Sequence, residues 1–235
     1  MSPRSQDRPR PRPRRVGLAV ASAALALAAA TLATAATSAP SAGPGAGKAG
    51  PGNDTLTGGP GRDLVLLHAG DDVGYGGPDD DRLLGAAGHD RLLGEDGNDV
   101  LVGMPGDDLL DGGLGDDALQ GMDGNDQVLG GDGHDHVSGG IGNDRIDGSL
   151  GNDQLDGGFG FDTLFVGGGA DEVYGEQGDD FIFLLNDGVR DEVFCGPGLD
   201  QVLYVGGLDP LDNLGASAQC ESVTIADVLP SGWLY

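Results

Sequence analysis

Residues 112–147 read GGLGDDALQ, GMDGNDQVL, GGDGHDHVS and GGIGNDRID, four consecutive blocks of nine residues that share one pattern. In every block an Asp stands at the sixth position, Gly stands at the first and fourth positions, and an aliphatic residue stands at the eighth. A fixed period of this kind indicates a repeat architecture in which each block folds into the same small unit. The period therefore decides the fold class before any single residue is considered.

The nine-residue phase holds without insertion from residue 49 to residue 183, which makes fifteen blocks. The first position is Gly in twelve blocks, the fourth is Gly in fourteen, and the eighth is Leu, Val or Ile in fourteen. The sixth position is Asp in all fifteen: Asp54, Asp63, Asp72, Asp81, Asp90, Asp99, Asp108, Asp117, Asp126, Asp135, Asp144, Asp153, Asp162, Asp171 and Asp180.

Each column has a physical role. Glycines at the first and fourth positions permit positive φ and close approach of one chain segment to another, so we expect the first six residues to form a turn. Positions seven to nine alternate outward, inward and outward, as a short strand does. Two blocks then make one coil, and successive coils stack as parallel strands about 4.8 Å apart. The sequence predicts an all-β solenoid whose core is a thin aliphatic ladder at the eighth position.

The Asp column indicates the chemistry. Blocks two apart share one edge of the stack, so the aspartates form two files with neighbours about 5 Å apart. Unpaired neighbours repel by about 1 kcal/mol in water and by more in a lower dielectric. A hard divalent cation between successive turns would reverse this repulsion, and carboxylate and carbonyl oxygens suit calcium. The alternative is a β-helix whose Asp side chains only make turn hydrogen bonds.

The pattern G-G-x-G-x-D-x-U-x, with U aliphatic, resembles the RTX or haemolysin-type calcium-binding nonapeptide repeat over residues 49–183. The resemblance implies a right-handed parallel β-roll with two repeats per coil. It implies Ca²⁺ held by the sixth-position Asp of one block, the same Asp two blocks on, and turn carbonyls. The fifteen aspartates are then the expected metal ligands, and fifteen blocks allow at most 13 such sites. Residues 67–84 depart from the pattern at Leu67, Gly74 and Asp79, so we expect weaker calcium binding there.

The amino-terminal residues differ from the repeats. Residues 1–35 combine an Arg-rich start with an uncharged Ala/Leu-rich run and an A-x-A site at 33–35, which is typical of a secretory signal peptide. The uncharged residues 16–36 are also long enough to span a bilayer, so an uncleaved membrane anchor is the alternative. Residues 36–48 form a Gly/Pro/Ala linker. Both interpretations place the repeats outside the cytoplasm, and we expect a secreted protein.

Beyond residue 183 the phase slips by two residues, and residues 184–235 are expected to form degenerate coils and a carboxyl-terminal cap. Repeat stacks need such a cap to close the exposed end of the core. In an exported chain two cysteines favour a disulfide, here Cys195–Cys220, with two unpaired thiols as the alternative. Ser222–Ile225 is strand-like.

Three aromatic residues, Phe165, Phe181 and Phe183, take outward positions beside the carboxyl-terminal end of the repeats. They would pack under the cap or form a partner-binding patch.

The sequence offers no catalytic signature: neither H-E-x-x-H nor G-x-S-x-G occurs, and no enzyme is expected. The cluster His134-Asp135-His136 is one block of the repeat. His89 lies five blocks from His134, on the opposite edge, so the two cannot share a metal and we expect the histidines to be bystanders.

A net charge of −27 excludes nucleic acid and, after signal cleavage, anionic membranes as partners. The sequence predicts a secreted calcium-binding β-roll that folds when Ca²⁺ binds and acts as a structural or matrix module. A calcium-rigidified cell-surface adhesin, or another partner-binding module, is the alternative. The partners expected are calcium ions and a cell-surface or matrix component that no sequence feature identifies.

Overall fold

The computed structural model describes residues 49–206, 213–214 and 220–226, all within one compact unit, Ser41–Tyr235. These residues form nineteen β-strands and no helix. Among them there is accordingly no helix with the length and hydropathy of a membrane span. The expected signal peptide, its alternative as an anchor, and the linker all lie outside the described residues.

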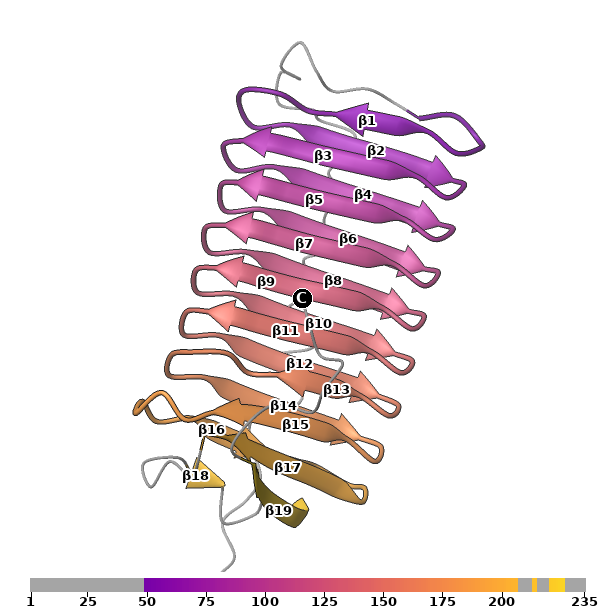
Figure 1. The fold of residues 1–235 in the computed structure, drawn as a ribbon. Helices are drawn as coiled ribbons and strands as arrows, with labels where there is room; N and C mark the ends of the chain where they lie inside the picture. The colour runs from indigo at the N-terminus through magenta and orange to yellow at the C-terminus, as the bar shows by residue number, and fades with distance from the viewer. Residues whose placement is uncertain (1–48, 207–212, 215–219, 227–235) are drawn as a thin grey trace, which may run out of the picture. The chain divides into compact units, whose positions relative to one another are not determined.

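The strands stack into two parallel sheets, in which each strand pairs with the strands two before and two after it (Figure 1). The ten-stranded sheet contains β1 (Thr55–Thr57), β3 (Val73–Pro78), β5 (Arg91–Asp96), β7 (Leu109–Leu114), β9 (Gln127–Asp132), β11 (Arg145–Leu150), β13 (Thr163–Phe165), β15 (Phe181–Leu185), β17 (Asp200–Val205) and β19 (Cys220–Ala226). The nine-stranded sheet contains β2 (Leu64–Ala69), β4 (Arg82–Ala87), β6 (Val100–Pro105), β8 (Ala118–Asp123), β10 (His136–Ile141), β12 (Gln154–Phe159), β14 (Glu172–Gln177), β16 (Glu192–Phe194) and β18 (Asn213–Leu214).

The coil is two blocks long, as predicted. Leu119 in β8 pairs with Val137 in β10, eighteen residues on, and the same offset relates Val128 in β9 to Ile146 in β11. The chain is therefore an all-β parallel solenoid of about nine turns, and the predicted fold class is confirmed.

The strands are longer than the sequence predicted. A regular strand such as β5, Arg91–Asp96, has six residues and runs from the seventh position of one block to the third position of the next. The prediction of a three-residue strand and a six-residue turn was wrong, because the segment that begins with Gly94 stays hydrogen-bonded to the next coil. The turn is only the Gly-x-Asp segment, here 97–99.

The glycines at the first and fourth positions of each block have different structural roles. Gly133, at the fourth position, has a φ of 154°, whereas no first-position glycine has positive φ. A Cβ built on Gly130, at the first position, would lie 2.5 Å from Oδ2 of Asp135 and 2.9 Å from the carbonyl oxygen of Gly148. The first position therefore needs glycine for close approach alone. Positive φ occurs at the second position instead, even for a non-glycine residue such as Glu95 (φ 78°).

The predicted aliphatic ladder fills the interior between the two sheets. Its fully buried or nearly fully buried eighth-position members are Val65, Leu83, Leu92, Leu101, Leu110, Leu119, Val128, Val137, Ile146, Leu155, Leu164, Val173 and Ile182. Burial of each such side chain contributes about 1.5–3 kcal/mol.

The ladder is not the whole interior. Leu67, at a first position, is fully buried and compensates for Gly74 in the ladder, since a Cβ on Gly74 would lie 3.2 Å from Cδ1 of Leu67. Val166, at another first position, is also fully buried. The expectation that only eighth-position side chains point inward was therefore wrong at these departures.

The predicted phase slip appears as a twenty-residue offset between Phe181 in β15 and Gln201 in β17. Cys195 and Cys220 form the predicted disulfide, with Cα atoms 5.4 Å apart. This bond ties β19, which contains the expected Ser222–Ile225 strand, to the preceding coils.

The three aromatic residues near this end lie on the outer face of the ten-stranded sheet. Phe165 and Phe183 stack with ring centroids 4.9 Å apart. Phe183 is nearly buried, whereas Phe181 is 44% exposed.

Candidate metal centre

The sixth-position aspartates are buried, although carboxylates are rarely buried without a partner. From Asp63 to Asp180 none is more than 5% exposed, while Asp54, in the first block, is half-buried. Each follows a tight turn and directly precedes a strand, so the sheet register fixes its place.

From Asp72 onward, one oxygen of each sixth-position carboxylate joins successive coils. The N–H of Asp99 donates to Oδ1 of Asp117 at 2.7 Å, and the N–H of Asp117 donates to Oδ1 of Asp135 at 2.9 Å. The same bond recurs every eighteen residues along both edges, for example from Asp108 to Asp126. The alternative role, turn hydrogen bonding, is therefore real for Oδ1.

The second oxygen, Oδ2, has a different environment. In the described part of the chain it is buried without a hydrogen-bond donor in Asp63, Asp72, Asp81, Asp90, Asp99, Asp108, Asp117, Asp126, Asp135, Asp144, Asp153, Asp162, Asp171 and Asp180. A single buried acceptor left without a partner costs about 1–3 kcal/mol, and more when it is charged. A bound cation would give this column of oxygens the partner that they lack.

Backbone oxygens share the space next to Oδ2. The point where a Cβ on Gly76 would lie is 2.7 Å from Oδ2 of Asp81 and also 2.7 Å from the carbonyl oxygen of Gly94. Beside Gly157 the corresponding oxygens of Asp162 and Gly175 lie at 2.8 and 2.7 Å. Most first-position glycines, though not Gly103 or Gly139, thus border a small cradle lined by a carboxylate oxygen and a carbonyl oxygen from the next coil on that edge.

This donor set fits calcium better than zinc. Within the described residues, no three or more His, Cys, Asp or Glu side chains gather at one point that could hold a metal. A cation in the cradle must take several ligands from backbone carbonyls, which is usual for Ca²⁺, whereas zinc prefers Cys and His. The residues present therefore fit a hard, oxygen-seeking ion.

The electrostatics favour the same ion. Burial raises the pKa of Asp117 to about 7; the N–H of Asp99 opposes this shift, and the charges of Asp135 and Asp99 add to it. Burial likewise raises the pKa of Asp126 to about 7, with the charges of Asp144 and Asp108 adding to it. Near neutral pH a proton and a cation therefore compete for these two carboxylates.

The fifth position also carries a function that the sequence analysis missed. Where the fifth residue is Asn, Asp or His, its side chain accepts the N–H of the corresponding residue one coil on. Nδ1 of His89 accepts from the N–H of Asp107 at 2.8 Å, and Nδ1 of His134 accepts from the N–H of Asn152 at 2.9 Å. That these histidines are bystanders to metal binding stays a prediction, but they have this role in the fold. The signal was available, since most fifth positions are Asn, Asp or His.

His134, Asp135 and His136 do not converge on one point. The ring of His136 instead contacts Oε1 of Gln154 at 2.8 Å on the outer face.

Two more aspartates extend the files beyond those expected. The N–H of Asp171 donates to Oδ1 of Asp191, and the N–H of Asp180 donates to Oδ1 of Asp200, both at 3.0 Å. Asp191 and Asp200 are both buried. The nine-residue recurrence of Asp after the slip was the sequence signal, but these residues were not among the expected ligands.

The fold and these files define a class: a parallel β-solenoid with buried carboxylates between its coils. The family model described as the RTX calcium-binding nonapeptide repeat (4 copies) matches residues 48–83, 75–110, 84–119, 111–146, 120–155 and 147–182. These segments together cover more than half of the chain, so the chain belongs to this family. The repeats imply that calcium ions bind. No curated protein sequence matches the chain.

Proposed function

We propose that this protein is a secreted calcium-binding β-roll that folds when Ca²⁺ binds between stacked turns and then acts as a structural or matrix module. One observation carries the proposal: buried Oδ2 atoms without donors face carbonyl oxygens of the next coil. In this proposal the ligands are the fifteen sixth-position aspartates from Asp54 to Asp180, acting in pairs two blocks apart. They form at most 13 sites, which bind most weakly within residues 67–84.

The proposed folding mechanism follows from charge. Without a cation the ionised files repel one another, and the glycine-rich turns lose much conformational entropy on ordering. A cation between the turns supplies a partner for each Oδ2 and links folding to binding. Extracellular calcium modules often bind at about 10⁻⁴–10⁻³ M, so folding would follow export.

The secreted location rests on two supports. RTX repeats are typical of secreted proteins, and the first 35 residues have the pattern of an export signal. The RTX β-roll is a structural calcium-binding fold that is not typically catalytic, and we propose no catalytic role.

Circular dichroism of the full chain tests this function. In EDTA we expect a disordered spectrum, and millimolar Ca²⁺ should convert it to a β spectrum while equal Mg²⁺ should not, because Mg²⁺ dehydrates reluctantly and demands octahedral geometry. An unchanged β spectrum in EDTA would overturn the proposal of calcium-coupled folding.

A calcium-rigidified surface adhesin is the second candidate, and exposed apolar side chains along one edge favour it. Ile141 and Phe159 are neighbours in β10 and β12, and they are 57% and 53% exposed; nearby Phe161 is 62% exposed. We expect an adhesin to bind cell envelope or glycans in calcium but not in EDTA, and to lose binding when Phe159 and Phe161 are both changed to Ser. Equal retention of both proteins would rule out this candidate.

A further inference from the structure

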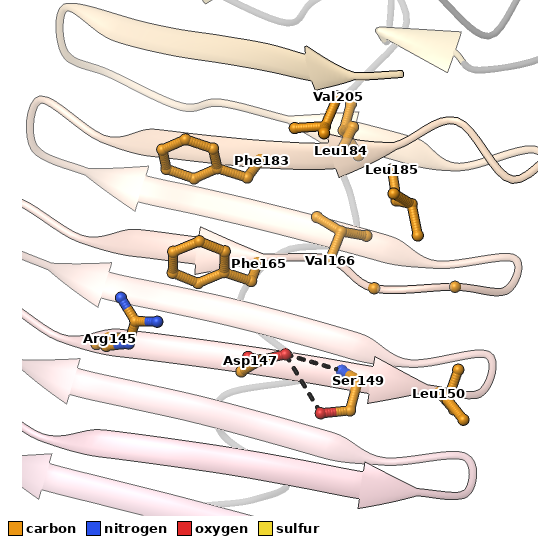
Figure 2. Close-up of a pocket in the computed structure, with 12 residues that line it drawn as sticks. Arg145, Asp147, Ser149, Leu150, Phe165, Val166, Phe183, Leu184, Leu185 and Val205 are labelled. Carbon is orange, nitrogen blue, oxygen red and sulfur yellow. Dashed lines mark hydrogen bonds between the residues drawn. The ribbon is translucent and has the colours of Figure 1, made fainter. Parts of the chain in front are cut away.

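The outer face of the ten-stranded sheet carries a hollow of about 280 Å³ (Figure 2). It lies where β13 ends early. β11 runs for six residues, but β13 stops at Phe165 after three. Only an isolated bridge between Leu150 and Gly168 continues the pairing.

Two glycines border the hollow. Gly167 and Gly168 follow Val166; the backbone of Gly167 lies against that of Ser149, and Gly168 bridges to Leu150. A Cβ built on Gly168 would meet no atom nearer than 3.5 Å, and the φ of Gly168 lies outside the left-handed region. The hollow is thus unfilled space over an accessible backbone.

Most of its wall is apolar. Phe165 and Phe183 form a parallel stack, with an interplanar angle of 8°. Leu150 is 60% exposed and Leu185 is 46% exposed, and Val205 completes this wall. A single ring or a branched aliphatic group would bury its surface against these side chains.

One side of the hollow is polar. Asp147 is half-buried there, and its Oδ1 accepts bonds from the N–H and the hydroxyl of Ser149 at 3.1 and 3.3 Å. The guanidinium of Arg145 lies 4.2 Å from the centroid of the Phe165 ring, over its face. Burial raises the pKa of Asp147, and the Ser149 hydrogen bonds and the charge of Arg145 oppose the shift. A cationic group beside Asp147 would therefore relieve an electrostatic cost.

We propose that this hollow binds a small organic cation: an ammonium group beside Asp147, attached to one aromatic ring or branched aliphatic body lodged against Phe165, Phe183 and Leu150. The chain's net charge of −27 disfavours an anionic ligand of the same shape. None of the sixth-position aspartates lines the hollow, so loss of probe binding with calcium-dependent folding intact counts against this site and not against the proposed function.

Three probes that share one ring but differ in charge test the ligand class: benzylamine, benzyl alcohol and benzoate. Each is titrated by NMR into the full chain in calcium while the Phe165 and Phe183 ring resonances are followed. Benzylamine should bind about tenfold more tightly than benzyl alcohol, and benzoate should not bind, because a charge-assisted bond to Asp147 is available to the cation alone. Benzoate binding equal to that of benzylamine, or no shift with any probe, would overturn the proposal.

Substitutions locate the site. Asp147→Asn should lower benzylamine affinity about tenfold, to the level of benzyl alcohol, and leave benzyl alcohol binding unchanged. Gly168→Leu should fill the hollow and abolish binding of both probes. Asp96→Leu adds the same side chain at the same repeat position in β5, far along the sheet, and should leave binding unchanged.

Calcium-dependent circular dichroism checks that each variant folds. If Gly168→Leu does not fold, the comparison of benzylamine with benzyl alcohol in Asp147→Asn alone decides whether the cation binds beside Asp147. Unchanged benzylamine binding in either folded variant would contradict the assignment.

Discussion

The regular coils, residues 85–165, and the irregular pair of blocks, residues 67–84, hold their aspartates in the same geometry although their sequences differ. The irregular blocks contain Asp72 and Asp81, whose Oδ1 atoms still accept the N–H groups of Asp54 and Asp63 of the preceding coil at 2.7 Å. Both acceptor carboxylates are about 1% exposed, as in the regular coils.

In the irregular blocks, by contrast, the glycine and aliphatic positions of the repeat carry other residue types. Leu67 replaces a first-position glycine, Gly74 replaces a ladder residue, and Asp79 occupies a fourth position with a φ of 83°. Sheet register therefore fixes the carboxylates, while the core columns tolerate change where a neighbour compensates. Weaker calcium binding by the irregular blocks stays a prediction. Four experiments test how the carboxylates, the core and the glycine positions contribute to stability and calcium binding.

The largest effect expected is that of pH on the calcium-free protein. Burial raises the pKa of Asp126 to about 7 and that of Asp81, in an irregular block, to about 6, from an ordinary value of 3.8. A raised carboxyl pKa stabilises the fold below about pH 4, and this contribution is lost as pH rises to about 6 or 7. Thermal unfolding in EDTA should show more native structure at pH 4.5 than at pH 8.

Several carboxylates titrate together, which is why this effect should exceed that of any single substitution. Calcium should remove most of the pH dependence above pH 6, since the cation replaces the proton. Stability in EDTA that rises with pH would show that the carboxylates are not buried in the calcium-free fold.

The next effect concerns the compensating pair in the irregular core. Leu67→Gly should destabilise the calcium-bound protein by about 2–5 kcal/mol through the cavity it leaves. Gly74→Leu alone should cost about 1–3 kcal/mol by overpacking against Leu67, Leu83 and Leu92. The double variant restores the regular repeat and should recover most of both losses in denaturant unfolding. Additive losses would show that the two positions do not share one space.

A smaller effect is expected at the cradle. Gly130→Ala places a Cβ against Oδ2 of Asp135 and the carbonyl of Gly148, and should cost about 1–3 kcal/mol by overpacking while weakening calcium binding. Gly168→Ala is the matched control, because its Cβ meets nothing nearer than 3.5 Å. Calcium titrations of both variants, followed by circular dichroism, make the comparison. Equal calcium midpoints for the two variants would show that the cation does not bind beside Gly130.

The smallest effect concerns the exposed fifth position. His134→Ala removes the acceptor for the N–H of Asn152 and should cost about 0.5–1.5 kcal/mol in thermal unfolding. His134→Asn should cost less, since Asn125 accepts the same kind of bond from the N–H of Asn143 at 3.0 Å. A larger loss with Asn than with Ala would contradict a purely structural role.

Much of the fold could be predicted because a nine-residue period leaves few alternatives. The coil of two blocks, the ladder through Leu119 and Val137, and the Cys195–Cys220 pairing follow from periodicity and from the even number of cysteines. The strand ends could not be predicted in this way, because glycine has no side chain to mark whether its backbone pairs. Left-handed φ at the second position could be expected where that residue is Gly, but not at Glu95, where the side chain gives no such signal.

The sequence by itself determined the solenoid, its two files of aspartates and its aliphatic core, because these features depend only on residue type and period. The tertiary structure decided which carboxylate oxygen is left without a donor, that Asp191 and Asp200 continue the files, and that a hollow opens beside Asp147. Each of these depends on contacts between residues eighteen or twenty positions apart. Such contacts exist only after the coils have stacked; the recurrence of Asp at nine residues hints at Asp191 and Asp200 but does not show which atoms meet.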